Sequence, residues 1–356
     1  MRIAQVAPLY ECVPPKLYGG TERVVAYLTD ELVRQGHDVT LFSSGDSTTL
    51  AHHVPVGETA VRLDSSCIDP LARHILLLEK VFARAKEFDV LHFHIDYLHF
   101  PMSRRHAVPN LTTLHGRLDI PDLVPIYDEY PEMPVVSISD AQRVPLPHLN
   151  WLGTVHHGLP GGLYRLGSGS GGYLAFLGRL SPEKRPDRAI RIAERAGVKL
   201  LIAAKVDRAD RTYFEECIRP MLRSPWVEFI GEIGEGEKNE FLGNAKALLF
   251  PIDWPEPFGL VMVEAMGSGT ATIAFDCGSV REIIDEGVTG FIVNSEEEAV
   301  EAVGRVDSLD RMLCRRQFER RFTVEQMAGA YALQYARLLH HIPTKPRLTN
   351  KDERAA

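Results

Sequence analysis

Residues 256–264 read Glu-Pro-Phe-Gly-Leu-Val-Met-Val-Glu, and this stretch is the strongest signal in the chain. Two carboxylates, Glu256 and Glu264, stand eight positions apart across a Pro/Gly turn and the start of an apolar helix. The first N–H groups of a helix have no intrahelical partners, so they can bind a phosphate. Acids on either side of such a turn can hold hydroxyl groups. The pattern therefore suits a diphosphate that lies between two polyhydroxylated rings.

Within this stretch, Gly259 is placed to start the helix, and the N–H groups of Leu260 and Val261 would then face outward. Glu264 lies one helical turn beyond Leu260 on the same face, so we expect it to reach a ribose beside the phosphate. Glu256 precedes the turn and would meet the other ring. The alternative is an ordinary helix with a surface glutamate after a Pro-Phe turn.

Two cations precede this turn in the sequence. Residues 178–184 read Gly-Arg-Leu-Ser-Pro-Glu-Lys and follow the expected strand 173–177. Arg179 offers a planar fork and Lys184 a point charge, and together they can straddle a diphosphate. A solvated loop with ordinary surface cations is the alternative, but a place at the carboxyl end of a strand favours binding.

The composition excludes several classes of protein. The chain has 356 residues, a length that predicts two domains. Its net charge of -8 argues against a nucleic-acid binder. No window approaches the ~18 consecutive apolar residues of a membrane span. The N-terminus reads as a first strand and is too short an apolar run for a signal peptide. Five cysteines without a CxxC pair indicate a reducing compartment, so we expect a cytoplasmic protein.

Strands and helices alternate along the chain in two series. The first is expected to hold a helix at 21–35 and strands at 2–7, 38–43, 90–93, 111–114 and 135–137. The second is expected to hold strands at 173–177, 199–203, 227–230, 247–251, 272–275 and 290–293. This order predicts an α/β protein of two doubly wound, Rossmann-like domains that face a central cleft. A final amphipathic helix at 324–339 would pack through Met327, Tyr331, Leu333 and Tyr335.

The glycine-rich stretch 167–172, GSGSGG, fits G-x-G-x-x-G but precedes a strand. A dinucleotide fingerprint needs the strand before the glycines and the helix after them. We therefore interpret the stretch as a flexible linker. The order of elements also argues against a nicotinamide-dependent dehydrogenase.

Taken together, these residues resemble the retaining glycosyltransferases of family 4, which have the two-domain GT-B fold. The resemblance runs along most of the chain. The two specific motifs are 178–184 and 256–264. Weaker matches are Gly19-Gly20, residues 36–39 (GHDV), residues 113–116 (TLHG) and residues 155–158 (VHHG).

The resemblance implies roles for individual residues. Arg179 and Lys184 would neutralise the donor diphosphate, Glu256 would bind the donor sugar, and Glu264 would bind the ribose. His115 matches a family histidine beside the donor sugar, and with Glu256, Lys184 and Arg179 it completes the expected catalytic set. The other expected donor-binding residues are the loop glycines Gly19 and Gly20, the base-contacting Glu232 and Ile233, and the turn residues Phe258, Gly259, Leu260 and Val261.

The resemblance also implies the reaction and the division of the chain. Residues 1–160 would form the acceptor-side domain and 161–323 the donor domain. Residues 324–342 would cross back onto the first domain, and 343–356 would form a disordered tail. We expect a sugar to move from a nucleoside-diphosphate sugar, here a UDP-sugar, to an acceptor hydroxyl with retention and without a metal or cofactor.

Three alternatives to this reaction remain at this point. They are a GT-B epimerase or hydrolase, a non-catalytic sugar-nucleotide-binding protein, and the dehydrogenase already mentioned. Product analysis with and without acceptor would separate the first from a transferase. Three stretches depart from the family or map onto no motif of it: Ala204-Lys205, residues 276–279 (DCGS), and the acidic residues 120–133.

Several histidines cluster in the first half. His92, His94, Asp96 and His99 suggest a metal site, because His92 and His94 share one face of a strand. Zinc sites usually need three or four ligands, so we interpret the pair as packed or cleft-lining, with His94 on the acceptor side. His156 and His157 are interpreted as structural residues near a hinge.

Overall fold

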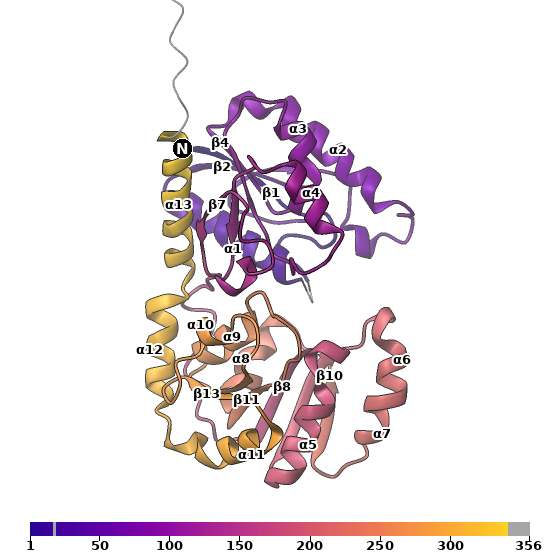
Figure 1. The fold of residues 1–356 in the computed structure, drawn as a ribbon, viewed down its shortest axis with the longest axis vertical. Coiled ribbons are helices and arrows are strands. Elements are labelled where there is room, and N and C mark those ends of the chain that lie inside the picture. The colour runs from indigo at the N-terminus through magenta and orange to yellow at the C-terminus, as the bar shows by residue number, and fades with distance from the viewer. Residues whose placement is uncertain (17–18, 341–356) are drawn as a thin grey trace, which may run out of the picture.

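Two parallel β-sheets form the two halves of the molecule, one above the other in Figure 1. The computed structural model describes residues 1–16 and 19–340. The first sheet has the strand order β3-β2-β1-β4-β5-β6-β7. Its strands are β1 (Arg2–Val6), β2 (Asp38–Ser43), β3 (His52–Pro55), β4 (Val90–Phe93), β5 (Asn110–Thr113), β6 (Val135–Ser137) and β7 (Trp151–Thr154).

The second sheet has the order β10-β9-β8-β11-β12-β13, and its strands are also parallel. They are β8 (Tyr173–Arg179), β9 (Lys199–Lys205), β10 (Val227–Gly231), β11 (Ala247–Phe250), β12 (Thr272–Phe275) and β13 (Gly290–Val293). The predicted pair of doubly wound α/β halves is therefore confirmed.

Helices connect the strands and cover the sheets. The first half holds α1 (Gly20–Arg34), α2 (Pro70–Ala83), α3 (Phe100–Ser103) and α4 (Leu123–Glu129). The second half holds α5 (Pro186–Ala196), α6 (Arg211–Tyr213), α7 (Arg219–Met221), α8 (Glu235–Asn244), α9 (Leu260–Gly267), α10 (Val280–Ile283), α11 (Glu296–Arg305) and α12 (Arg311–Arg321). The last helix, α13 (Val324–His340), lies along the first half (Figure 1).

Both faces of the first sheet are buried, as parallel sheets require. On β1, Ile3 packs into a cluster with Leu28 of α1 and Tyr331 of α13. Its neighbour Ala4 points to the opposite face and packs with Leu77 of α2. This arrangement explains why the strands read as continuous apolar runs in the sequence.

The strand order of each sheet reverses beside its first strand, between β1 and β4 and between β8 and β11. In open parallel sheets, ligands bind at the carboxyl ends of the strands at this point. The two reversal points, one in each sheet, therefore predict where a ligand between the halves would bind.

The chain crosses between the halves twice, and the two crossings lie side by side. Leu159 pairs with Thr323 in a short β-bridge. The N–H of Leu159 donates to the carbonyl of Phe322, and the carbonyl of Leu159 accepts from the N–H of Val324. A Cβ atom at Gly158 would stand 2.2 Å from the carbonyl oxygen of Thr323, so this close approach requires glycine.

Two expectations about elements need correction. The structure adds the strands β3 and β7, which are short edge strands without the fully buried apolar runs of the central strands. Leu333 does not pack with the rest of α13, because its side chain is 62% exposed, whereas Tyr331 and Tyr335 are buried. Residue 333 lies two positions from 331 and so falls on another face of the helix. The predicted tail at 343–356 lies outside the described residues.

The GSGSGG stretch is not a free linker. The N–H groups of Gly169 and Gly171 donate to the carbonyls of Gly243 and Asn244 at the end of α8, each at 2.9 Å. A Cβ atom at Gly167 would stand 2.1 Å from the carbonyl oxygen of Gly243. The glycines therefore serve close backbone packing, which a composition-based interpretation cannot detect.

The acidic segment 120–133 has a structural role in the first half. It contains α4, and Arg104 binds Glu129 at 2.7 Å and Glu132 at 2.6 Å.

Within the part of the chain that the structure describes, no helix has the length and apolarity needed to cross a membrane.

Candidate functional site

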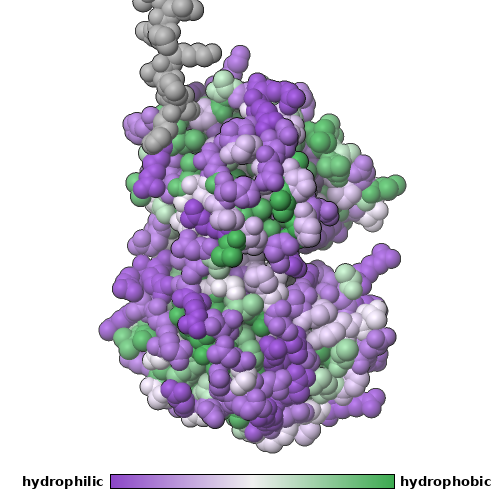
Figure 2. All heavy atoms as spheres, viewed as in Figure 1, coloured by the Kyte–Doolittle hydropathy of each residue, from purple (hydrophilic) through white to green (hydrophobic). Residues whose placement is uncertain are grey.

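A cavity of about 730 Å³ lies between the two halves, and residues of both line it. Figure 2 shows the surface hollowed between the halves on the side away from α13. Every site residue predicted from the sequence lines this cavity: Gly19, Gly20, His94, His115, Arg179, Lys184, Glu232, Ile233, Glu256, Phe258, Gly259, Leu260, Val261 and Glu264.

The turn before α9 is held in a conformation that glycine favours. Gly259 precedes the helix with φ 79°, and a Cβ atom there would lie 2.7 Å from the Cε of Met262. The hydroxyl of Ser279 donates to the carbonyl of Phe258 at 2.8 Å, and its N–H donates to the carbonyl of Glu256 at 3.1 Å. The divergent segment 276–279 therefore supports the turn, and the amino end of α9 faces the cavity.

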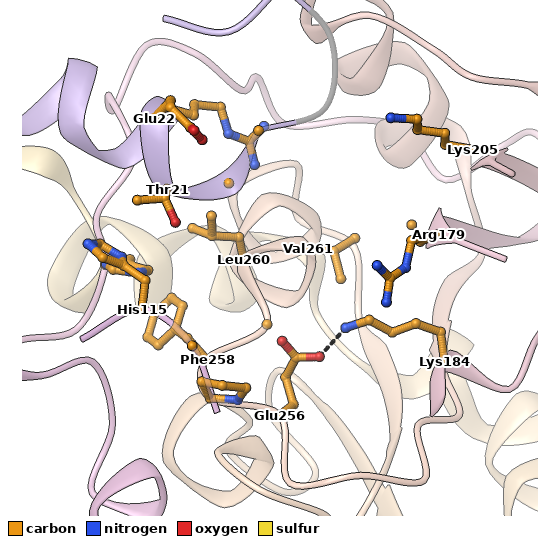
Figure 3. A pocket seen from close by; sticks show the side chains of 18 of the residues that line it. Thr21, Glu22, His115, Arg179, Lys184, Lys205, Glu256, Phe258, Leu260 and Val261 are labelled. Atoms are coloured by element: carbon orange, nitrogen blue, oxygen red, sulfur yellow. Dashed lines mark hydrogen bonds and ion pairs between the residues drawn. The ribbon is translucent and has the colours of Figure 1, made fainter. Parts of the chain in front are cut away.

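Lys184 and Arg179 lie on one side of the cavity, at the carboxyl end of β8 (Figure 3). The Lys184 ammonium forms an ion pair with Glu256 and stands 4.9 Å from the ring centre of Trp254. Arg179 contacts Glu183 and lies 3.3 Å from Asp210. Both predicted phosphate-binding cations therefore sit within one cluster of charges beside the turn.

Glu264 is buried at the other end of this motif and binds two cations. Its Oε1 lies 2.5 Å from Nη2 of Arg23 and 3.1 Å from Nζ of Lys238. Arg23 also binds Glu235 at 2.6 Å. Burial alone would raise the pKa of Glu264, but Arg23 and Lys238 outweigh it and lower that pKa. The carboxylate is thus held in its charged form.

His115 and His94 line the cavity from the first half. His94 follows β4, His115 follows β5, and Nδ1 of His94 lies 2.9 Å from Nε2 of His115. Figure 3 shows His115 on the opposite side of Leu260 and Val261 from Lys184. Burial lowers the pKa of His115 to about 3 and that of His94 well below its usual value. Both rings are therefore neutral at physiological pH.

His157, which the sequence assigned to a structural role near a hinge, also lines the cavity. Its ring stacks on His115 with centroids 5.2 Å apart, and it meets Phe258 edge to face. His156 instead contacts Glu282 at 3.2 Å, a residue of the second half that also accepts from the N–H of Asp140.

Two histidines of the candidate metal cluster, His92 and His99, have hydrogen-bond partners at both ring nitrogens. The ring nitrogens of His92 contact Tyr335 and Thr113, and those of His99 contact Ser103 and Thr112. Within residues 1–16 and 19–340, no group of three or more His, Cys, Asp or Glu side chains is arranged to hold a metal ion.

Asp96 lines the cavity with an unusual backbone. Its φ is 49°, a left-handed conformation that few residues other than glycine adopt. The surrounding protein raises the pKa of its carboxyl to about 6 by desolvation. This carboxyl is one of the titratable groups on the cavity wall of the first half.

Sequence reasoning missed the cluster of Arg23, Glu235 and Lys238 around Glu264. A signal was present, because Arg23 follows the Gly19-Gly20 pair at the start of a helix. The partner of Arg23 is 241 positions away, however, so the contact could not be found from spacing.

The geometry defines a two-domain protein that presents the turn before α9, paired acids and cations to an interdomain cavity. Two family models match the chain: "Glycosyl transferases group 1" over residues 168–317 and "Glycosyltransferase Family 4" over residues 18–134. The chain belongs to the glycosyltransferases of the family 4 type, has the GT-B fold, and is a glycosyltransferase enzyme.

Individual relatives agree with this assignment. An uncharacterized glycosyltransferase of Methanocaldococcus jannaschii is 24% identical over 343 residues, which cover 82% of this chain and 85% of the relative. The solved AviGT4, a glycosyltransferase of avilamycin A biosynthesis, is 24% identical with a TM-score of 0.73, covering 96% of this chain and 99% of its own. Anabaena HepE, solved with UDP and glucose, is 18% identical with a TM-score of 0.74. The match covers 95% of this chain and 100% of the HepE chain.

Proposed function

We propose that this glycosyltransferase moves a sugar from a nucleoside-diphosphate sugar to an acceptor hydroxyl, with retention of anomeric configuration and without a divalent metal. One observation carries the proposal. The amino end of α9, Arg179, Lys184 and Glu264 all face one cavity, which lies at the strand-order reversal of the second sheet. This arrangement offers a diphosphate both backbone donors and cations, and it offers the adjoining ribose a carboxylate.

Charge on the leaving group is the main demand of the reaction. The nucleoside diphosphate gains negative charge as the glycosidic bond breaks. We expect Arg179, Lys184 and the N–H groups at the start of α9, which line the cavity, to stabilise that charge. In the proposed reaction these groups take the part that a divalent cation plays in other phosphate-transfer sites.

Retention is proposed from the resemblance to the retaining family 4 enzymes, and the two acids of the motif at 256–264 bear on the route. Glu256 is ion-paired to Lys184, and Glu264 binds Arg23 and Lys238. Neither is a solitary carboxylate suited to act as a nucleophile beneath the sugar. We therefore favour attack by the acceptor on the same face that the diphosphate leaves, assisted by the departing phosphate oxygen.

UDP is the proposed nucleotide, supported by the HepE complex with UDP and glucose on the same fold. A thermal-shift panel of UDP, GDP, ADP and their sugars, with NAD as a control, tests this. Binding to the folded state at 100 times Kd stabilises it by about 2.7 kcal/mol, which raises the Tm measurably. We expect a shift with the UDP series, lost in Glu264→Gln and kept in Glu240→Gln, an exposed glutamate on α8.

Two results would count against the proposal. A shift with NAD alone would mean that the turn at 256–264 has another ligand. Release of free sugar at the same rate with and without acceptors would indicate a hydrolase.

A further inference from the structure

We propose that the cavity wall of the first half binds an apolar group of the acceptor, beside the hydroxyl that receives the sugar. The acceptor would then be an amphiphile and not a bare polyhydroxylated sugar. This inference rests on the proposed function, because it names the class of the second substrate of the same cavity. The apolar wall consists of Pro8, Tyr10, Leu71, Ile95, Tyr97 and Leu98.

The apolar wall lies at the strand-order reversal of the first sheet. Residues 8–10 follow β1 and residues 95–98 follow β4, and the strand order reverses between these two strands. Ligands of open parallel sheets bind in the crevice outside the carboxyl ends of the strands at such a point. The wall is therefore placed to bind a ligand of its own, separate from the nucleotide that we expect on the second half.

The two sides of the cavity differ in chemistry. The second half lines it with cations such as Arg179 and Lys184 and with acids such as Glu256. On the first half, Arg62 and Asp96 are the charged lining residues beside the apolar wall: the guanidinium of Arg62 lies 5.7 Å from the ring centre of Tyr10, and Asp96 belongs to the segment 95–98.

This contrast decides what the wall can bind. A bare sugar needs a hydrogen-bond partner for each hydroxyl that leaves water, because burying a hydroxyl without one is costly. Apolar and aromatic side chains offer few such partners. They are stabilised when an apolar group covers them and removes them from water. The wall therefore favours an acceptor that carries an apolar group next to its hydroxyl.

The first turn of α2 is fixed against the loop that follows β1. The N–H of Leu9 donates to Nε2 of His74 at 3.1 Å, and Nδ1 of His74 donates to the carbonyl of Pro70 at 2.8 Å. The ring centroids of His74 and Tyr10 are 4.9 Å apart. Leu71 follows Pro70 in the same turn, so Leu71 and Tyr10 are held in place before a ligand binds. Such preorganisation lowers the entropic cost of binding.

The apolar wall runs from the interior of the cavity to its mouth. Ile95 is buried, whereas Tyr10 and Leu71 are exposed and would be covered by a bound apolar group. Figure 2 shows hydrophobic atoms on the part of the first half beside the hollow, where Figure 1 places α2. Further along α2, Ile75 and Leu76 are also exposed but stand outside the cavity lining.

Calorimetric titration with methyl β-glucoside and hexyl β-glucoside tests the wall without any donor. The two probes share one hydroxyl-bearing head and differ in the apolar group. Hexyl β-glucoside should bind at least about tenfold more tightly, because even a single methylene in a hydrophobic pocket is worth that factor. Equal affinity for the two probes, or tighter binding of the methyl probe, would overturn the proposal.

Leu71 and Leu76 provide a matched pair of variants. Both leucines are on α2 and are similarly exposed, at 54% and 60%, but of the two only Leu71 lines the cavity. Leu71→Ser should remove most of the preference for hexyl β-glucoside, whereas Leu76→Ser and the conservative Leu71→Met should keep it. The Tm of each variant should stay near that of the wild type. Equal losses in the two serine variants would contradict binding inside the cavity.

Two other partners of α2 would also overturn the proposal. Co-sedimentation with phosphatidylcholine vesicles that both serine variants lose equally, in a protein that does not bind hexyl β-glucoside, would assign the exposed face of α2 to a membrane. A dimer in sedimentation equilibrium that both variants dissociate would assign it to a second copy of this chain.

Saturating UDP separates this inference from the proposed function. Hexyl β-glucoside should bind equally well with UDP present, because the apolar wall and the expected nucleotide-binding groups belong to different halves. Competition between the two ligands would place the probe in the nucleotide site and overturn the inference. If no nucleotide raises the Tm, the proposed function fails, whereas titration with the two glucosides still decides what the apolar wall binds.

Discussion

The guanidinium of Arg23 lies 2.5 Å from the carboxylate of Glu264, and the two residues belong to opposite halves of the molecule. Arg23 is on α1 beside the Gly19-Gly20 pair, whereas Glu264 is on α9 and is the predicted ribose-binding acid. Little of either side chain is exposed, 11% of Arg23 and 3% of Glu264. The contact therefore joins the predicted nucleotide site to both halves of the molecule.

Replacing Arg23 by methionine should weaken both stability and nucleotide binding. The variant leaves Glu264 and Glu235 with fewer cations in a buried site, and breaking a buried pair costs about 3–5 kcal/mol. Urea unfolding and the Tm shift with UDP would measure the two effects. Arg34→Met is the control, because Arg34 lies on the same helix with 54% of its side chain exposed. Equal losses in both variants would contradict the assigned contact.

Lys184→Ala should lower turnover by orders of magnitude while the fold stays intact. The variant removes a cation from the leaving diphosphate and leaves Glu256 without its ion-pair partner. Steady-state kinetics beside a circular dichroism spectrum would check this. Lys199→Ala serves as the control, since Lys199 pairs with Glu228 on the exposed edge of the same sheet. Near-normal turnover of Lys184→Ala would reject its role.

Gly259→Ala should destabilise the enzyme and abolish nucleotide binding. The new Cβ would stand 2.7 Å from Met262 in a backbone with φ 79°. Gly36→Ala is the matched comparison, because Gly36 has φ 85° but no described atom within 4 Å of the new Cβ. An alanine held in this left-handed conformation costs about 1–2 kcal/mol of stability in either variant. Unfolding midpoints should thus fall further for Gly259→Ala, and only that variant should lose the Tm shift with UDP.

The free energy of unfolding should fall as the pH drops below about 6.5. Burial lowers the folded-state pKa of His115 to about 3, so in this interval its imidazole takes up a proton only in the unfolded chain. Protonation then favours unfolding, by up to about 1.4 kcal/mol per pH unit for each such histidine. Urea midpoints at pH 7 and pH 5 would measure the slope. His115→Gln should make the slope less steep by the share of this one histidine, and a slope unchanged by the variant would contradict a neutral buried ring.

A second acid-sensitive group lies at the interface of the halves. Burial alone would raise the pKa of Glu235, but Arg23 and Lys238 outweigh it and lower that pKa to about 2. The unfolded carboxyl takes up its proton near pH 4.3, so the stabilisation from Glu235 is present above that pH. It is lost as the pH falls from there toward 2. In Arg23→Met this part of the acid titration should shrink.

Most of the fold could be predicted from local patterns. Central strands such as β4 and β12 are buried on both faces, so they appear in the sequence as short apolar runs. Edge strands such as β3 carry no such pattern and were missed. Leu333 was placed on the wrong face of its helix, because an apolar side chain on an exposed face resembles a core residue in the sequence.

The candidate site divides in the same way. The sequence by itself determined the turn at 256–264 and the cations of 178–184, because a turn before a helix and the end of a strand are built from neighbours in the chain. Only the tertiary structure decided that Arg23 binds Glu264 and that Gln5 donates a hydrogen bond to Tyr335. These contacts join residues hundreds of positions apart. Their geometry depends on how two separately formed sheets pack, and local spacing carries no record of that packing.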